Sequence, residues 1–195
     1  MPKIDNDKFY TSAIEKFGST ARGVNWASRA NQLLRFKELT KYLPKNMQNY
    51  SLVDAGCGFG HLYHYLEKKS LTPKRYIGLD SVLDMYSIAS EETAQEIIYL
   101  DICKESIPKA DYYLCSGALN VLTKFETYLF IRNCYNASKK AFIFNALHGE
   151  KQSETYNYLS TKEIENLAKE LNVGSLKYHH NYMENDITVI MSKKE

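Results

Sequence analysis

The sequence has 195 residues, of which 44% are hydrophobic and 25% charged, and its formal net charge is +2. This length suits one domain with its own core, and the composition excludes disordered and fibrous proteins. The lysine pairs lie at predicted element ends, so the basic stripe with which proteins bind long nucleic acids is missing. We therefore expect no nucleic-acid partner.

Targeting segments and cysteine motifs are also missing. No apolar run approaches the roughly 20 residues that cross a bilayer, and the first ten residues lack the apolar core of a signal peptide. The four cysteines form no CxxC pair, which argues against a zinc site and against a disulfide framework. We expect a cytoplasmic protein without a metal or a membrane partner, either monomeric or homodimeric.

The first quarter of the chain predicts two helices. Residues 5–17 and 28–43 carry apolar residues at helical spacing, and Pro44 ends the second segment. The stretch between them, residues 18–26, contains two glycines and is predicted to be a loop. We expect residues 1–49 to form a helical cap or lid on a core domain at 50–195.

Short apolar runs alternate with amphipathic stretches in the middle of the chain. This alternation predicts βαβ units and a mostly parallel sheet. The predicted strands are 51–54, 76–80, 96–100, 111–115 and 141–147, and the predicted helices are 61–68, 82–90 and 125–138.

The end of the chain follows a different pattern. A helix over 161–171 begins with Ser160 and Glu163, which are spaced as a capping box. The strand-like runs 175–180 and 187–191 follow, and the gap between them is too short for a helical crossover, which needs about a dozen residues. The fold class is therefore α/β, with a Rossmann-like, mostly parallel seven-stranded sheet that ends in an antiparallel hairpin.

A glycine-rich loop, VDAGCGFG at 53–60, follows the first strand and begins a helix. In this context such a loop favours ligand binding over a plain turn. A nicotinamide dinucleotide fits poorly, because His61 replaces the third glycine and Asp54 would repel a pyrophosphate. S-adenosylmethionine carries an ammonium, a sulfonium and no phosphate, so the same aspartate would attract it.

Together with YIGLD at 76–80, this loop resembles the first two motifs of the class I S-adenosylmethionine-dependent methyltransferases. The resemblance extends from about residue 50 to the end of the chain, and the N-terminal stretch is similar to small bacterial members. It implies S-adenosyl-L-methionine as the cofactor, with the glycine loop at its methionine part, Asp80 at the ribose hydroxyls and Asp101 at the adenine. The residues implied to contact the cofactor are Asp54, Ala55, Gly56, Cys57, Gly58, Gly60, Asp80, Ser81, Asp101, Ile102, Ser116 and Gly117.

Several of these residues have a structural interpretation that stays open. Asp80 could instead cap the following helix, and Asp101 could be a turn aspartate. Arg22 and Trp26, from the loop between the first two helices, could approach the cofactor or the acceptor, whereas Trp26 could equally pack the helices onto the sheet.

The acceptor is less well indicated. The fourth motif ends in SGALN, which lacks the Asn/Asp-Pro-Pro-aromatic sequence of enzymes that methylate base or glutamine amines. We expect O-methylation of a small polar metabolite, with a sugar or a phosphate-bearing compound as candidates. His148, directly after the fifth strand, is the candidate general base, and Asn120 could orient the acceptor. A noncatalytic module that binds the cofactor and a nicotinamide-dependent oxidoreductase are the alternatives.

Overall fold

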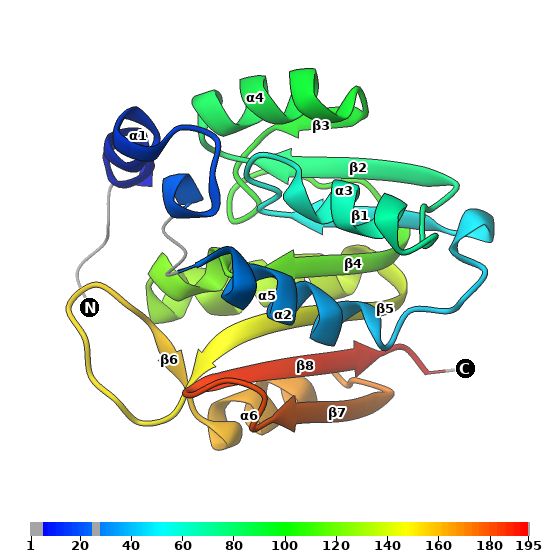
Figure 1. Ribbon diagram of the computed structural model, residues 1–195. Helices are drawn as coiled ribbons and strands as arrows, with labels where there is room; N and C mark the ends of the chain where they lie inside the picture. Colours follow the sequence, from blue (N-terminus) through cyan, green and yellow to red (C-terminus); the bar gives the residue numbers. More distant parts are fainter. Residues whose placement is uncertain (1–5, 25–27, 195) are drawn as a thin grey trace.

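The computed structural model describes residues 6–24 and 28–194. Within these ranges the chain forms one sheet with strand order β3-β2-β1-β4-β5-β8-β7, and β6 pairs with β5 beside this path (Figure 1). The strands are β1 (Ser51–Ala55), β2 (Arg75–Asp80), β3 (Glu96–Tyr99), β4 (Ala110–Ser116), β5 (Ser138–His148), β6 (Tyr158–Leu159), β7 (Ser175–His180) and β8 (Asp186–Ser192).

The predicted sheet is confirmed. β1 to β5 pair in parallel, whereas β8 is antiparallel to both β5 and β7. The two-residue strand β6 was not predicted, because it has no apolar period of its own and exists only through its pairing with β5.

The helices cover both faces of this sheet. They are α1 (Asn6–Phe17), α2 (Arg29–Thr40), α3 (His61–Lys68), α4 (Leu83–Thr93), α5 (Lys124–Ala137) and α6 (Thr161–Glu170), with 3-10 turns η1 (Ala21–Val24), η2 (Met47–Asn49) and η3 (Ala118–Val121). In β5, Phe142 and Phe144 belong to the core under α5 and α6, whereas Ile143 belongs to the core under α2 and α3. Alternation along the strands thus builds two cores. No helix in the described part of the chain is long and apolar enough to cross a membrane.

Helix ends follow local hydrogen bonds. The predicted capping box of α6 is present, with the Glu163 amide donating to Ser160 Oγ and the Glu163 carboxylate accepting from the Ser160 amide. α2 ends at Thr40, three residues before the predicted end, because the Leu43 amide turns back to the Thr40 carbonyl. The link between β3 and β4, residues 100–109, contains no helix.

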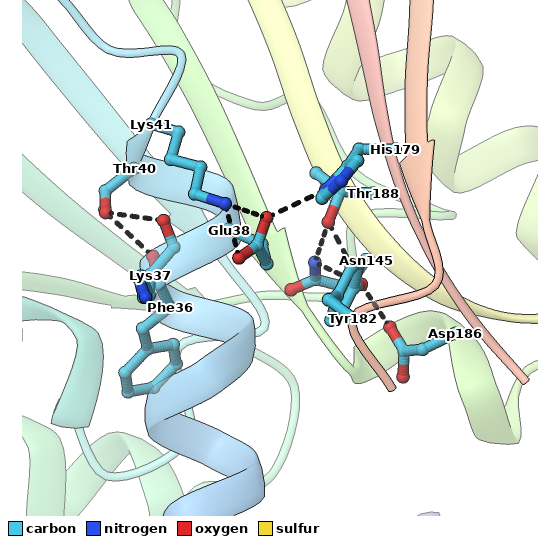
Figure 2. Close-up of polar contacts among 10 residues, drawn as sticks. All are labelled: Phe36, Lys37, Glu38, Thr40, Lys41, Asn145, His179, Tyr182, Asp186 and Thr188. Atoms are coloured by element: carbon cyan, nitrogen blue, oxygen red, sulfur yellow. Dashed lines mark hydrogen bonds and ion pairs between the residues drawn. The ribbon is translucent and has the colours of Figure 1, made fainter. Parts of the chain in front are cut away.

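A layer of buried polar side chains joins α2 to the closing hairpin. Arg35 Nε donates to Asp186 Oδ2 at 2.5 Å, and both side chains are almost completely buried. The Tyr182 hydroxyl donates to Asp186 Oδ1, also at 2.5 Å. Asn145 of β5 donates to Thr188 Oγ1 of β8 at 2.7 Å beside Tyr182 (Figure 2). An ion pair therefore attaches α2 to the start of β8, in addition to apolar contacts.

A second contact of the same helix lies one turn further along. The buried carboxylate of Glu38 accepts from Lys41 Nζ at 2.6 Å and pairs with His179 Nδ1 of β7 at 2.9 Å (Figure 2). The N-terminal helix α2 is thus held against both strands of the hairpin.

We predict that Arg35→Ala lowers the free energy of unfolding by about 3 to 5 kcal/mol, because it leaves the Asp186 carboxylate buried without its cation. Urea denaturation at pH 7.5 measures the change. Arg132→Ala, which removes an exposed arginine of α5, is the matched control and should change stability by less than about 0.5 kcal/mol. Equal effects of the two variants would contradict the importance of the buried pair.

Candidate functional site

A cavity of about 680 Å³ opens at the carboxyl ends of β1, β2 and β4, and it is called the main cavity below. This volume lies within the range of small-molecule sites, and the place is where open α/β sheets bind ligands. Ten of the predicted cofactor residues line it: Asp54, Gly56, Cys57, Gly58, Asp80, Ser81, Asp101, Ile102, Ser116 and Gly117.

The glycine loop has no room for side chains at two positions. Gly56 has φ +76°, and a Cβ there would lie 2.5 Å from the Ala118 Cβ. Gly60 has φ +77°, and its Cβ would lie 2.2 Å from the Thr93 Cγ2. Left-handed backbone and close approach both require glycine here. The loop therefore brings its backbone next to the end of β4.

Asp80, at the end of β2, holds this loop in place. Its Oδ2 accepts from the Gly58 amide at 2.8 Å, and its Oδ1 accepts from the Val82 amide at 3.0 Å just before α4. Asp80 thus has the local structural role considered from the sequence and also lines the main cavity. A carboxylate oxygen can accept more than one hydrogen bond, so these contacts do not exclude a ligand.

Asp54, at the end of β1, is 2% exposed and accepts from the Tyr76 hydroxyl at 2.7 Å. Burial raises the pKa of Asp54 to about 7, since the hydrogen bond from Tyr76 only partly offsets it and the negative charge of Asp80 adds to it. A carboxylate that ionises only near neutrality favours a cationic ligand, which would stabilise the ionised form.

Asp101 follows β3 and begins a turn. Its Oδ1 accepts from the Cys103 amide at 2.9 Å, and its Oδ2 pairs with Lys104 Nζ at 2.7 Å. The turn interpretation is therefore present in the structure. The same residue also lines the main cavity together with Ile102, so this contact does not exclude a binding role.

The end of β4 joins the main cavity to the neighbouring loops. Ser116 Oγ donates to Asn145 Oδ1 at 3.3 Å. Asn120 lines the cavity, and its Oδ1 accepts from the Leu147 amide at 3.1 Å while its backbone carbonyl accepts from the Asn157 amide at 2.7 Å. Asn120 thus links η3 to β5 and to the loop before β6.

His148 lies apart from this group. It is not among the described residues that line the main cavity, and its Nε2 lies 3.0 Å from Thr161 Oγ1. Its ring stacks on His180 with centroids 6.2 Å apart. Burial, and then the neighbouring His180, lower the pKa of His148 below its usual value. The structure does not bring the candidate base together with the candidate cofactor residues.

Four further predicted residues do not line the cavity or cannot be placed. Ala55 is buried in the sheet, and Gly60 contributes only the backbone that begins α3. Arg22 is exposed, with its guanidinium 5.9 Å from the centroid of the Phe17 ring. Trp26 lies outside the described residues.

Comparisons with known proteins agree with the fold described above. No protein-family model matches the sequence. A Mycobacterium tuberculosis protein named "Putative methyltransferase Rv1506c" is 27% identical over 158 residues, covering 74% of this chain and 93% of that protein. Magnesium protoporphyrin IX methyltransferase from Synechocystis PCC 6803, solved with S-adenosylmethionine bound, shares the fold over 99% of both chains with a TM-score of 0.73 and 12% identity.

An S-adenosylmethionine-dependent methyltransferase from Mesorhizobium loti gives a TM-score of 0.66 at 14% identity, over 82% of this chain and 98% of that one. The chain has the fold of these S-adenosylmethionine-dependent methyltransferases, and its glycine loop and second strand resemble the first two motifs of the class I family. The resemblance of the glycine loop and of the second strand to this family is confirmed.

The sequence predicted a helical cap at 1–49 but did not identify which residues of α1, α2 and the loop 149–157 line the main cavity. Gln32 and Arg35 are polar residues at the buried spacing of α2, and this pattern was the available signal. Gln32 Nε2 lies 3.2 Å from His61 Nδ1, which joins α2 to the start of α3. The other missed lining residues include Tyr10, Phe36, Phe59, Met85 and Tyr156.

We predict that Asp54→Asn stabilises the cofactor-free protein in a pH-dependent way. The folded carboxyl stays neutral up to about pH 7, whereas its ordinary pKa is 3.8, so rising pH favours the unfolded state by about 1.4 kcal/mol per unit between these values. Asparagine does not titrate. The advantage of the variant should therefore grow from pH 4.5 to pH 7 and stay level above it.

Urea unfolding at pH 4.5, 6 and 8 measures this difference. Asp84→Asn changes an exposed aspartate of α4 and serves as the control. A stability difference for Asp54→Asn that does not vary with pH would show that Asp54 is ionised throughout.

Proposed function

We propose that this methyltransferase transfers the methyl group of S-adenosylmethionine to an oxygen of a small polar metabolite. The observation that carries the proposal is the charge pattern of the main cavity. Two buried carboxylates, Asp54 and Asp80, lie at its glycine-loop end, and the guanidinium of Arg35 lies in its α2 wall. The glycine-loop end of this cavity complements a ligand that carries an ammonium, whereas the charge of Arg35 is paired with Asp186.

The residues present fit the cofactor part by part. Asp54 would attract the ammonium, and Asp80 would accept from the ribose hydroxyls. Asp101 and Ile102 would border the adenine. Each of these roles requires a side chain that already lines the main cavity.

When bound, the cofactor would supply a methyl group on a sulfonium to an acceptor hydroxyl oxygen, with S-adenosylhomocysteine and a proton as the other products. What the chain contributes is alignment and exclusion of water. Ser116 and Gly117, at the end of β4, would line the place of transfer, and Asn120 would orient the acceptor through its side-chain amide.

The N-terminal helices supply the cover in this proposal. Tyr10 of α1 packs against the core of Phe59, Val82 and Met85, and it lines the main cavity. We propose that residues 1–49 act as a cap over the core at 50–195, which limits the access of water to the sulfonium.

Two measurements test the alternatives, which are a nicotinamide-dependent enzyme and a noncatalytic module. Calorimetric titration with S-adenosylmethionine, S-adenosylhomocysteine and NAD separates a methyltransferase from a nicotinamide enzyme, and Asp54 argues against a pyrophosphate. Methyl transfer in a metabolite screen then separates an enzyme from a noncatalytic module. Binding of NAD alone would overturn the proposal.

We predict that Asp80→Ala weakens S-adenosylhomocysteine binding at least tenfold, because hydrogen bonds from two hydroxyls to a charged acceptor are each worth about 1.5 to 3 kcal/mol. Calorimetry measures the affinity, and circular dichroism checks that the variant is folded, since Gly58 and Val82 lose an acceptor too. Asp84→Ala is the control. Unchanged affinity in a folded Asp80→Ala protein would remove Asp80 from the site.

His148 was the candidate general base in the sequence, and we propose instead that turnover does not require it. Its Nε2 contacts Thr161 and it lies off the wall of the main cavity, so we expect His148→Ala to keep turnover within a fewfold of the parent from pH 6 to 9. Steady-state kinetics with the acceptor found in the screen measures this. A loss of about a hundredfold with cofactor affinity preserved would establish His148 as the base.

A further inference from the structure

A second cavity of about 540 Å³ shares Tyr156 with the main one and is lined largely by the loop that connects β5 to β6. Figure 1 shows the course of this loop. Residues of this loop, 149–157, form most of the wall of the second cavity. Lys124 of α5, Tyr158, Ser160 and Glu163 of α6 form the rest. Tyr156 lines both cavities. A ligand that extends beyond the main cavity on this side would therefore pass the ring of Tyr156.

The backbone of Tyr156 is held from both sides. Its amide donates to Ser153 Oγ at 3.1 Å. The next residue, Asn157, donates from its amide to the Asn120 carbonyl at 2.7 Å and from its side chain to the buried Thr127 Oγ1 at 2.8 Å. The ring itself is 38% exposed. A fixed backbone with an exposed ring offers a stacking surface at low entropic cost.

The second cavity does not offer charges for a phosphate. Lys124 Nζ is bonded to Glu163 at 2.7 Å and to the Tyr158 carbonyl at 2.5 Å, and Lys151 lies over the Tyr158 ring at 5.9 Å. Three glutamates, Glu150, Glu154 and Glu163, outnumber these two lysines in the wall. A dianionic group would be repelled there.

Uncharged polar groups make up the rest of this wall. Gln152 supplies an amide, and Tyr156 and Tyr158 supply hydroxyls and aromatic rings, whereas the side chains of Ser153, Asn157 and Ser160 bond to other groups of the protein. Hydroxyls and amides can both donate and accept, which suits a ligand with many hydroxyls, and aromatic rings suit the apolar face of a sugar ring.

We infer that the acceptor is an uncharged polyhydroxylated molecule of glycoside type that spans both cavities. Its reacting hydroxyl lies at the end of β4, and its remainder occupies the second cavity against Tyr156. This inference rests on the proposed function. It narrows the acceptor from a small polar metabolite to an uncharged sugar, and it excludes the phosphate-bearing compounds that the sequence left as candidates.

Saturation-transfer NMR on the full chain with S-adenosylhomocysteine bound tests it. The probes are the methyl glycosides of glucose, galactose, mannose and rhamnose, with glucose 6-phosphate and mannose 6-phosphate as charged counterparts. We expect at least one uncharged glycoside to bind more tightly than both phosphates. Tyr156→Ala should raise its dissociation constant at least about fivefold, whereas Tyr156→Phe keeps the ring and should stay within about twofold.

Tyr178→Ala is the matched control, because this tyrosine of β7 is 39% exposed and lines neither cavity. Equal effects of Tyr156→Ala and Tyr178→Ala would overturn the inference, as would tighter binding of a sugar phosphate or binding of no glycoside while S-adenosylhomocysteine is bound. The last results would leave the cofactor assignment standing. A folded protein that does not bind S-adenosylhomocysteine would overturn both this inference and the proposed function.

Discussion

The buried ion pair of Arg35 and Asp186 sets the geometry of the whole site. Isolating either charge from water costs several kcal/mol, so the fold must keep the guanidinium and the carboxylate together. This requirement places α2 across the start of β8, although the two residues lie 151 positions apart in the chain. Gln32 and Phe36, on the same face of the helix as Arg35, then line the main cavity.

The opposite wall depends on a second electrostatic arrangement. Asp54 and Asp80 end neighbouring parallel strands, so the sheet itself brings two carboxylates to one edge. Burial raises the pKa of Asp54, and two backbone amides hold Asp80. Negative charge that is costly in the free protein would become favourable beside a cation, which supports the proposed binding of an ammonium at this wall.

A polar layer joins the end of β4 to the α2 wall. Ser116 at the end of β4 donates to Asn145. Asn145 donates to Thr188, and the Tyr182 hydroxyl beside them donates to Asp186 (Figure 2). The proposed place of methyl transfer and the α2 wall thus share one hydrogen-bonded layer, which favours a rigid site of the kind that catalysis by alignment needs.

The sequence by itself determined the sheet, its closing hairpin and the residues of the glycine loop, because apolar period, turn chemistry and motif spacing are local properties of the chain. The carboxyl ends of parallel strands must meet at one edge, so Asp54, Asp80 and Asp101 could be grouped without coordinates. Only the tertiary structure decided which distant segments close the cavity. The contacts of Arg35 with Asp186, of Gln32 with His61 and of Tyr156 with both cavities join residues from separate segments. It also separated His148 from the cavity, since strand order alone does not say where the side chain of the last residue of β5 points, and here its Nε2 lies beside Thr161.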